Sequence, residues 1–466
     1  MRLSHLLDNL PPVSTVPGAR AEIARHSQAT RTRLVVVDDD PTGSQTVHGV
    51  RVYLDWSPKT LRAALASDRP VSFLSVNTRA LPADDVRGLA AALGADLVAA
   101  ARAEGVGLRV ASRSDSTLRG HFPIEVDALE SGLGWKCDGV IIAPAFFEAG
   151  RYTVGDVQYV VQGDDVAPAS ETEFARDPAF GYRNSDLKLW IEEKTGGSIR
   201  ANEVCSVSIE IIRRGGRDAV AAELMRVSGG RPVVVNAACY EDYEVFVLGL
   251  LAAEARGKRF IYRCAAPFVK VRGGIQDRPL LTAAEIGASD GAGLVLVGSY
   301  VARTSRQLDV LLEAGLAVGL EMQVGPLLDA NTREEEIART AERATERLAA
   351  GRTAAIFTSR EVLGVRDEEF LEAGKAIVAG LCQAVSRIGV RPGFVVAKGG
   401  ITSTEVARSA LGIKAAEVLG QILGGVPVWR PGEECKWPKV PYIVFPGNVG
   451  DDNALRDVVS VLVSRG

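Results

Sequence analysis

Three consecutive aspartates, Asp38 to Asp40, follow the apolar run Leu34–Val37 and precede the sequence Pro-Thr-Gly. Adjacent carboxylates repel one another, and a turn or a helix cap at the end of a strand needs only one Asp. The other two therefore indicate a ligand whose hydroxyl groups a carboxylate can bind. We expect Asp38 to be structural, because it ends the strand, and Asp39 and Asp40 to face the ligand.

A second polar cluster lies in the sequence SRSDSTLRGHF, residues 112–122, which also follows an apolar run. It places the carboxylate of Asp115, the hydroxyls of Ser116 and Thr117 and the guanidinium of Arg119 within five residues. A carboxylate can orient a hydroxyl or remove its proton, and Arg binds a carboxylate or phosphate through two parallel hydrogen bonds. A capped turn with a surface salt bridge would use the same residue types. The combination favours a site for a hydroxylated acid.

Two further strand ends carry residues of the same kind. Asn77 and Arg79 follow the run Val71–Val76, and Arg151 follows the run Gly139–Ala143. Because the carboxyl ends of parallel strands meet at one edge of a sheet, we expect these side chains to lie near the two acidic clusters.

Three strand ends in the C-terminal half favour phosphate binding. The sequence KGGITSTE, residues 398–405, follows the run Phe394–Ala397 and combines a lysine with two glycines. Thr402 and Glu405 have capping-box spacing, which predicts that a helix begins there. The N–H groups at the start of a helix attract anions, although an ordinary capped turn would share this pattern.

The other two junctions are the sequence GSY at residues 298–300 and the sequence PGNVGDD at residues 446–452. Thr304 and Gln307 form another predicted capping box after the first of them. The sequence contains neither GxxxxGK[ST] nor GxGxxG, so these junctions predict a nucleotide site of a less common type.

Short apolar, β-branched runs alternate with helical stretches along the chain, a pattern typical of α/β proteins with parallel sheets covered on both faces. A chain of 466 residues is too long for one core, so we expect two domains, divided between residues 275 and 293. Residues 150–200 are too long for an ordinary loop and predict either an inserted subdomain or a lid or substrate loop. The predicted strands contain Leu34–Val37, Val71–Val76, Leu108–Ala111, Gly139–Ala143, Pro232–Val235, Phe260–Tyr262, Leu294–Val297, Ala354–Thr358, Phe394–Ala397 and Tyr442–Phe445.

The bulk composition limits the class of protein. Apolar residues make up 47% of the chain, charged residues 24%, and the net charge is −4, which gives no support for a nucleic-acid or membrane-surface binder. The six cysteines are scattered singly and predict buried thiols of a cytoplasmic protein. The chain shows neither the layout of a signal peptide nor the ~20 consecutive apolar residues of a membrane-spanning helix.

Six segments resemble the four-carbon acid sugar kinase family, formerly a family of unknown function. In the N-terminal half these are DDPTGSQTV from Asp39, SDSTLRGHFPIEVDAL and APAFFEAGR; in the C-terminal half they are VGSYVARTSRQL, KGGITSTEVARSALGI and PGNVGDDNAL. They occur in the family's order over nearly the whole chain. The sequence departs from the family pattern at Pro41, Ser44 and Ile401, at FPGN before the last turn, and in the length of residues 1–30 and 150–200.

The resemblance implies an ATP-dependent kinase that phosphorylates a hydroxyl of a short sugar acid, such as threonate, erythronate or a 3-oxo-tetronate, in carbohydrate catabolism. It implies an α/β fold of two domains, each a mainly parallel sheet flanked by helices, with the active site in the cleft between them. The expected segments are an N-terminal extension (1–30), a sugar-acid-binding domain (31–280) and a nucleotide-binding domain (290–466). ATP and Mg²⁺ are the expected cofactors, with a homodimer as a further expectation.

The candidate residues fall into three sets. Asp115 and Asp40 are the candidate catalytic carboxylates, and Asp115 is slightly favoured. The candidate substrate-binding residues are Asp39, Asp40, Asn77, Arg79, Asp115, Ser116, Thr117, Arg119 and Arg151. The candidate nucleotide-binding residues are Ser299, Lys398, Gly399, Gly400, Ile401, Thr402, Gly447 and Asn448.

Other functions remain open from the sequence. The departures from the family pattern leave room for a branched substrate of the oxo-apionate type. A metal-dependent aldolase or hydrolase could use the Asp cluster, with His48 and His121 nearby, although so few histidines favour an oxygen-bound Mg²⁺ over zinc or iron. A non-catalytic sensor that binds a sugar acid and a nucleotide is a third interpretation. No metal ligands are assigned.

Overall fold

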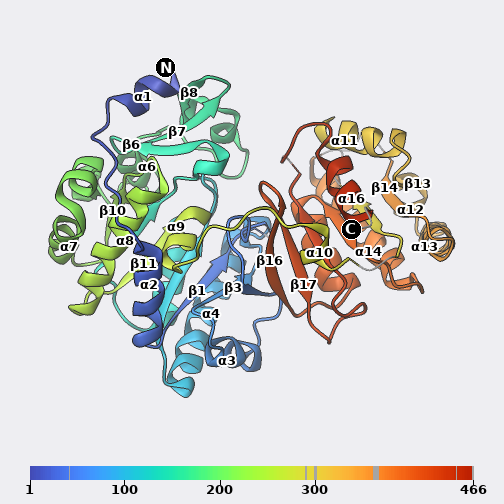
Figure 1. The fold of residues 1–466 in the computed structure, drawn as a ribbon, viewed down its shortest axis with the longest axis horizontal. Helices are drawn as coiled ribbons and strands as arrows, with labels where there is room; N and C mark the ends of the chain where they lie inside the picture. Colours follow the sequence, from blue (N-terminus) through green and yellow to red (C-terminus); the bar gives the residue numbers. More distant parts are fainter. Residues whose placement is uncertain (41, 289–290, 299–301, 360–366, 448, 464–466) are drawn as a thin grey trace. The chain divides into compact units, whose positions relative to one another are not determined.

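The computed structural model describes two compact units (Figure 1). Unit 1 comprises Met1–Gly43 and Asp55–Asp277, and unit 2 comprises Ser44–Leu54 and Arg278–Gly466. The chain therefore passes from one unit to the other at three points. The described residues are 1–40, 42–288, 291–298, 302–359, 367–447 and 449–463.

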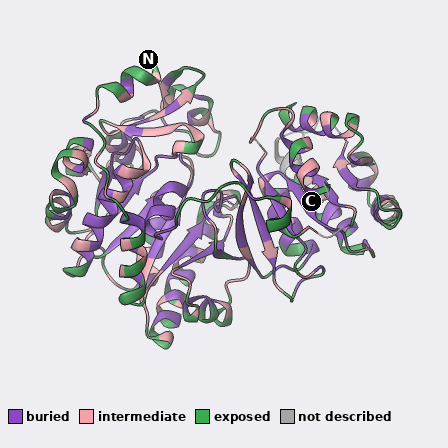
Figure 2. Ribbon diagram, in the orientation of Figure 1, coloured by how far each residue is buried: buried purple, intermediate pink, exposed green. Residues whose placement is uncertain are grey.

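Unit 1 contains a seven-stranded sheet in the order β3-β1-β4-β11-β5-β10-β9, and all neighbouring strands are parallel. Figure 2 shows these strands as mostly buried. A parallel sheet buried on both faces needs near-continuous apolar runs, which is the pattern of the predicted strands. The strands are β1 (Thr32–Asp38), β3 (Val71–Ser75), β4 (Gly107–Arg113), β5 (Gly139–Ala143), β9 (Cys205–Val207), β10 (Arg231–Val235) and β11 (Phe260–Cys264).

Two groups of helices cover this sheet. The first group packs together as α3 (Pro58–Ala66), α4 (Ala83–Glu104) and α5 (Ile124–Leu133). The second consists of α2 (Ala19–Ala29), α7 (Gly216–Arg226), α8 (Tyr240–Ala255) and α9 (Ala266–Arg272). The neighbouring strands β4 and β11 are followed by helices of different groups, an arrangement that leaves a crevice beyond the carboxyl ends of an open α/β sheet.

Residues 150–200 contain a small antiparallel sheet, β6 (Arg151–Val154), β7 (Val157–Gln162) and β8 (Asp165–Pro168). The short turn η4 (Glu173–Arg176) and the helix α6 (Leu187–Lys194) follow it. These residues therefore have secondary structure of their own, whereas a role as a lid or substrate loop stays a prediction. We call residues 151–194 the inserted subdomain.

Unit 2 contains the strands β13-β14-β12-β15-β18-β17-β16-β2 in that order. The first five are parallel, whereas the last three add antiparallel neighbours. The last strand, β2 (Val50–Tyr53), comes from the N-terminal part of the chain. The others are β12 (Leu294–Val297), β13 (Val318–Met322), β14 (Ala354–Thr358), β15 (Val395–Lys398), β16 (Ala415–Leu423), β17 (Val426–Pro431) and β18 (Tyr442–Phe445).

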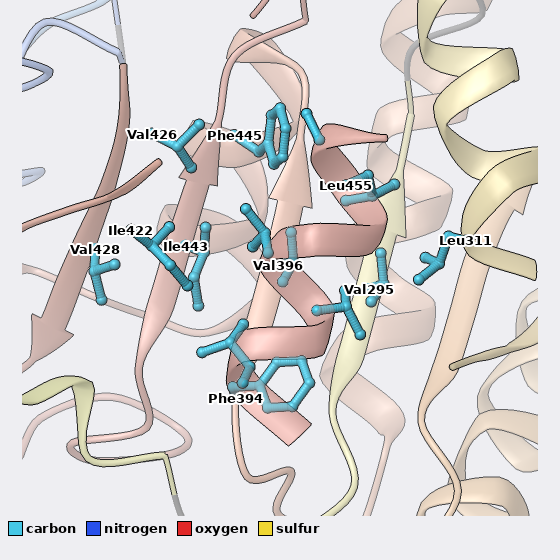
Figure 3. Packing of buried hydrophobic residues seen from close by; sticks show 14 of the residues in the cluster. Val295, Leu311, Phe394, Val396, Ile422, Val426, Val428, Ile443, Phe445 and Leu455 are labelled. Carbon is cyan, nitrogen blue, oxygen red and sulfur yellow. The ribbon is translucent and has the colours of Figure 1, made fainter. Parts of the chain in front are cut away.

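The core of unit 2 lies between this sheet and the helices α11 (Ala302–Glu313) and α16 (Ala454–Val463) (Figure 3). Val295, Val396 and Ile443 contribute from three neighbouring strands. A second group of helices packs separately, namely α12 (Val324–Leu328), α13 (Arg333–Ala349), α14 (Asp367–Arg387) and α15 (Gly400–Glu405). The predicted α/β class, with a mainly parallel sheet in each unit, is confirmed.

The ten apolar runs each overlap a strand. The sequence did not indicate β2, β9, β13, β16, β17 or the strands of the inserted subdomain, because a short run of mixed polarity carries a weak period-two signal. All six cysteines are free, but Cys205 and Cys239 are partly exposed, so the expectation of six buried thiols is wrong for these two. In the described part of the chain, no helix has the length and apolarity needed to cross a membrane.

The close packing of α4 on α5 should tolerate no side chain at Gly132. A Cβ there would lie 2.0 Å from the carbonyl oxygen of Ala91, so Gly132→Ala should lower the free energy of unfolding by about 1–3 kcal/mol. Gly88 is the matched control, because it is exposed in α4 and has open space around its Cβ position. Gly88→Ala should raise stability by about 0.5–1 kcal/mol. Urea unfolding measures both, and a destabilisation of equal size at both positions would contradict the prediction.

Candidate functional site

The loops after β1, β3 and β4 are joined by their backbones at the carboxyl edge of the unit 1 sheet. The carbonyl of Asp38 accepts hydrogen bonds from the N–H groups of Val76 (3.0 Å) and Asn77 (3.2 Å). The carbonyl of Asp39 accepts one from Arg79 (3.3 Å), and the N–H of Asp39 donates to Arg113 (3.1 Å). The acidic cluster, Asn77, Arg79 and the strand that precedes Asp115 are therefore held together by main-chain bonds.

Arg79 connects the carboxylates that the sequence singled out. Its Nε and Nη2 donate to the two oxygens of Asp39 (3.1 and 2.6 Å), and its Nη1 donates to Asp40 Oδ2 at 3.1 Å. The same Nη1 lies 4.0 Å from Asp115 Oδ1. One guanidinium thus lies among the carboxylates that follow β1 and β4. Without this shared positive charge, their mutual repulsion would oppose the arrangement.

Asp38 is buried beneath the site. Its Oδ1 accepts from Arg113 Nη1 (3.4 Å) and from the N–H of Asp40 (3.3 Å). Burial raises the pKa of Asp38 to about 8, although Arg113 opposes the shift. A Cβ on Gly43 would lie 1.8 Å from Asp38 Oδ2, so only glycine fits where the loop passes over this carboxyl group.

Asp40 is more open to solvent, with 25% of its side chain exposed. Its Oδ1 accepts from the N–H and the hydroxyl of Thr42 at 2.8 and 2.5 Å. Burial would raise the pKa of Asp40, but the charge of Arg79 and the Thr42 bonds hold it below its usual value. Asp40 therefore stays ionised at neutral pH.

Asp115 is also held in its charged form. Its Oδ2 accepts from the hydroxyl of Thr117 and from Arg119 Nε, the latter at 2.8 Å. Although burial would raise the pKa of Asp115, the charges of Arg79 and Arg119 hold it well below the usual range. Leu118 in this loop has a φ of 69°, an unfavourable conformation for a bulky residue, which persists only where the surroundings fix the backbone.

The inserted subdomain provides that support. Gln158, which is fully buried, donates from Nε2 to the carbonyl of Ser116 (2.7 Å) and to that of Pro144 (3.2 Å). The hydroxyl of Tyr182 donates to the carbonyl of Thr117 at 2.7 Å. Two successive peptide carbonyls after Asp115 are therefore fixed by side chains of the inserted subdomain.

The candidate substrate-binding residues occupy different positions in this arrangement. Asp39, Asp40, Arg79, Asp115, Thr117 and Arg119 form one connected network of hydrogen bonds and ion pairs. Ser116 is buried, and its carbonyl is used by Gln158. Asn77 adopts a left-handed conformation with a φ of 52°. Arg151 approaches the network through Phe174, whose ring also lies near Arg119.

Sequence reasoning missed several residues of the site. Arg113 and Arg263 lie at the ends of buried strands, where each charged side chain pairs with a buried carboxylate, Asp38 and Glu125 respectively. An arginine inside an otherwise apolar run was the available signal for Arg263, since such a residue needs a partner. Gln158 and Tyr182 carried no such signal, because their partners are backbone carbonyls.

The predicted phosphate junctions lie at the carboxyl edge of the unit 2 sheet. The neighbouring strands β12 and β15 are followed by α11 and α15, which belong to different groups of helices. This is the position at which open α/β sheets bind ligands. Gly399 has a φ of 113°, and its N–H donates to the carbonyl of Phe445 (2.8 Å), which ties the turn to β18.

Lys398 is fully buried next to this turn. Its Nζ donates to the carbonyls of Pro446 (2.8 Å) and Gly447 (3.2 Å) and lies 4.1 Å from the ring centroid of Phe445. Burial lowers its pKa to about 7, and the charge of Arg303 adds to the shift. In this structure Lys398 holds the last glycine-rich turn, and its contact with a nucleotide stays a prediction.

The two predicted capping boxes of the C-terminal half are wrong. The helix α15 begins at Gly400 with Gly399 as its N-cap, so Thr402 lies inside it. Thr304 and Gln307 likewise lie inside α11. The side chains of Thr304 and Gln307 instead donate hydrogen bonds to the backbone of the last glycine-rich turn. Thr304 donates to the carbonyl of Gly447 (3.3 Å), and Gln307 donates to the carbonyls of Val449 (3.2 Å) and Asp451 (2.6 Å). The residue spacing of a capping box also occurs inside helices, so only the hydrogen-bond partners in the folded structure show whether the side chains cap a helix.

The remaining nucleotide candidates divide between described and undescribed residues. Ile401 is 56% exposed at the start of α15, and Gly400 precedes it in the same helix. Ser299 and Asn448, together with Pro41 of the acidic loop, lie outside the described residues. Among the described residues, no group of three or more His, Cys, Asp or Glu side chains is arranged to hold a metal ion.

Comparisons with known proteins agree with this division of the chain. Residues 34–272 match a family model described as a sugar-binding N-terminal domain, and residues 294–455 match one described as a nucleotide-binding C-terminal domain. Fold and matches together define a two-domain protein with a sugar-binding half and a nucleotide-binding half. The chain belongs to the four-carbon acid sugar kinase family.

The chain also resembles individual relatives, at sequence identities of 30% or less. The chain is 28% identical over 272 residues to a D-erythronate kinase of Heliobacterium modesticaldum, covering 57% of this chain and 54% of that protein. It is 30% identical over 293 residues to a D-threonate kinase of Bordetella bronchiseptica, covering 60% and 62%. These matches span between about half and two thirds of each relative. A crystal structure of a Salmonella typhimurium protein shares the fold, with a TM-score of 0.66, 19% identity and coverage of 92% and 98%.

The raised pKa of Asp38 predicts a specific pH dependence of stability. From its ordinary value of 3.8 up to about 8, the folded protein retains a proton that the unfolded chain has released. The contribution of Asp38 to stability therefore becomes less favourable as the pH rises through this window. Asp38→Asn cannot ionise and keeps an oxygen for Arg113, so its melting temperature relative to wild type should rise from pH 5 to pH 8.

Asp84→Asn is the control, because Asp84 is exposed at the start of α4. Its melting temperature should follow that of the wild type at every pH. A difference between Asp38→Asn and wild type that stays constant across the window would contradict the raised pKa.

Proposed function

We propose that the protein is an ATP-dependent kinase that phosphorylates a hydroxyl group of a short sugar acid. The observation that carries this proposal is the position of Arg79 among Asp39, Asp40 and Asp115, in the half that matches a sugar-binding domain. Ionised carboxylates held at fixed positions are suited to accept hydrogen bonds from the hydroxyls of a polyol. Membership of the sugar kinase family and the nucleotide-binding half supply the second substrate.

The reaction transfers the terminal phosphoryl group of ATP to a substrate hydroxyl oxygen. A new P–O bond forms to that oxygen, the bond to ADP breaks, and the hydroxyl proton is released. Such transfers depend mainly on positioning and on charge stabilisation. We assign Asp115 or Asp40 to orient the hydroxyl and accept its proton. Their lowered pKa values keep both ionised, which favours orientation over strong basicity.

We assign the nucleotide to the carboxyl edge of the unit 2 sheet. The turn at Gly399 and Gly400 and the last turn around Gly447 lie beyond the neighbouring strands β15 and β18, where N–H groups can approach phosphate. Mg²⁺ bound to ATP would neutralise part of the phosphate charge. Mg²⁺ commonly binds through phosphates, water and only one or two carboxylates, so the described residues are compatible with it although they form no dedicated metal cage.

The finer identity of the substrate also belongs to this proposal. The names of the two relatives, D-erythronate kinase and D-threonate kinase, favour a four-carbon sugar acid as the substrate. The reaction would belong to carbohydrate catabolism, and it would take place in the cytoplasm, where ATP is available. A branched oxo-acid is the alternative substrate. The test is ADP release with ATP and Mg²⁺ across a panel of four- and five-carbon sugar acids. Absence of turnover on all of them, together with absence of ATP binding, would refute the proposal.

Substitution of the candidate carboxylates should separate catalysis from folding. Asp115→Asn and Asp40→Asn should each lower kcat by roughly 10²-fold or more, the scale of a lost general base. Asp84→Asn, on the exposed start of α4, should keep the wild-type rate. Steady-state kinetics and thermal melting of each variant give the measurement. Unchanged kcat in both site variants would contradict the assigned role.

The lowered pKa of Lys398 predicts proton uptake when nucleotide binds. At pH 8 the buried amine, with a pKa of about 7, is mostly neutral, and phosphates bound nearby would raise its pKa. ATP binding should therefore take up protons at pH 8 and far fewer at pH 6, where the amine is already charged. Calorimetry in buffers of different ionisation enthalpy measures this difference.

Lys398→Arg is the matched control for this measurement. Arginine keeps hydrogen-bond donors for the carbonyls of Pro446 and Gly447 but does not lose its proton near neutral pH. The variant should show no uptake from this position. Equal uptake in variant and wild type would assign the proton to another group.

A further inference from the structure

We propose that Arg151, together with the ring of Phe174, forms the subsite for the carboxylate of the substrate, so that the inserted subdomain determines the preference for acids over neutral polyols. This inference rests on the proposed function for the identity of the ligand. It adds that the protein recognises the carboxylate end of the substrate and that the inserted subdomain carries the residues that bind this end.

Arg151 differs from the other arginines at this edge of the sheet in its charge partners. Four other arginines at this edge each lie within ion-pair distance of a carboxylate, whereas Arg151 has no such partner among the described residues. Its Nη1 donates to the backbone carbonyl of Ala149, and its Nε is buried without a hydrogen-bond partner. The paired arginines are Arg79 with Asp39, Arg113 with Asp38, Arg119 with Asp115, and Arg263 with Glu125.

A partly buried cation with no carboxylate in direct contact is unfavourable unless a ligand anion completes it; for Arg151, Asp115 and Glu173 act only from beyond ion-pair distance. Burial lowers the pKa of Arg151, whereas neighbouring carboxylates outweigh burial for Arg79, Arg113 and Arg119. A guanidinium still carries its charge at neutral pH because its ordinary pKa is so high. A bound carboxylate would supply both the missing negative charge and acceptors for the free N–H groups.

The position of Arg151 suits a substrate that also reaches the acidic network. The residue begins β6, shortly after the carboxyl end of β5. Its guanidinium carbon lies 5.7 Å from the ring centroid of Phe174, and that of Arg119 lies 5.2 Å from the same centroid. Arg119 in turn bonds Asp115. A short acid could therefore place its carboxylate at Arg151 and a hydroxyl near Asp115.

The inserted subdomain holds both ends of this arrangement. It carries Arg151 and Phe174, and through Gln158 and Tyr182 it fixes the carbonyls that follow Asp115. Asp177 lies 3.6 Å from Arg119 Nη1, so that Arg119 is paired on two sides. Arg119 is thus paired with carboxylates of the protein itself, whereas the guanidinium of Arg151 has no carboxylate within ion-pair distance among the described residues.

Arg151→Gln separates carboxylate recognition from a structural role. The variant should lose about 10- to 100-fold in kcat/KM for the sugar acid, mainly through KM, the scale of a lost hydrogen bond to a charged group. Turnover of the corresponding neutral tetritol, measured at high concentration, should stay within about two-fold of wild type. Arg151→Lys should recover part of the loss, since it keeps the charge but not the planar pair of donors. Arg176→Gln, at an exposed position of η4, is the matched control and should behave as wild type.

Binding without turnover provides the second measurement. Erythronate or threonate should raise the melting temperature of the wild type and of Arg176→Gln but not that of Arg151→Gln, while ADP should stabilise all three. Equal losses on acid and tetritol, or an unchanged acid-induced shift in Arg151→Gln, would overturn the inference. Failure of the proposed kinase function would look different, because the wild type would then show no turnover of any acid and no stabilisation by nucleotide.

Discussion

The structure of the candidate site depends on Arg79, whose guanidinium lies among three neighbouring carboxylates and offsets part of their negative charge. Asp39, Asp40 and Asp115 come from two strand ends, and their repulsion would separate these loops if Arg79 did not lie among them. The backbone N–H of Arg79 also bonds the carbonyl of Asp39, so the side chain that supplies the charge is fixed to the loop that needs it. The other contacts of the candidate site fix the loops that surround Arg79 and these carboxylates.

The region around Asp38 and the inserted subdomain each constrain one part of this arrangement. The carboxyl of Asp38 is enclosed by Gly43 and Arg113, and burial raises its pKa to about 8, which favours less negative charge at this position. To the side, the inserted subdomain fixes the loop after Asp115 through backbone carbonyls and holds Leu118 in an unfavourable conformation. A preorganised site of this kind can orient a hydroxyl without reorganising its own charges.

Much of this arrangement could be predicted and part of it could not. Apolar runs and the polar residues after them indicated the strands and the edge of the sheet where the candidate residues meet, because both signals are local. The capping box predicted from the spacing of Thr304 and Gln307 was wrong, because these side chains bond a turn more than 140 residues away. Gln158 gave no signal for the same reason, since its partner is the carbonyl of Ser116 and lies in another element.

The sequence by itself determined the α/β class, the family and the residues that stand at the carboxyl ends of the strands. These follow from local apolarity and from the chain order of short motifs. Only the tertiary structure decided which charges pair, because Coulomb energy depends on distances between residues such as Asp39 and Arg79, 40 positions apart. It also decided that Arg151 is left without a carboxylate among the described residues, a property that no spacing in the sequence encodes.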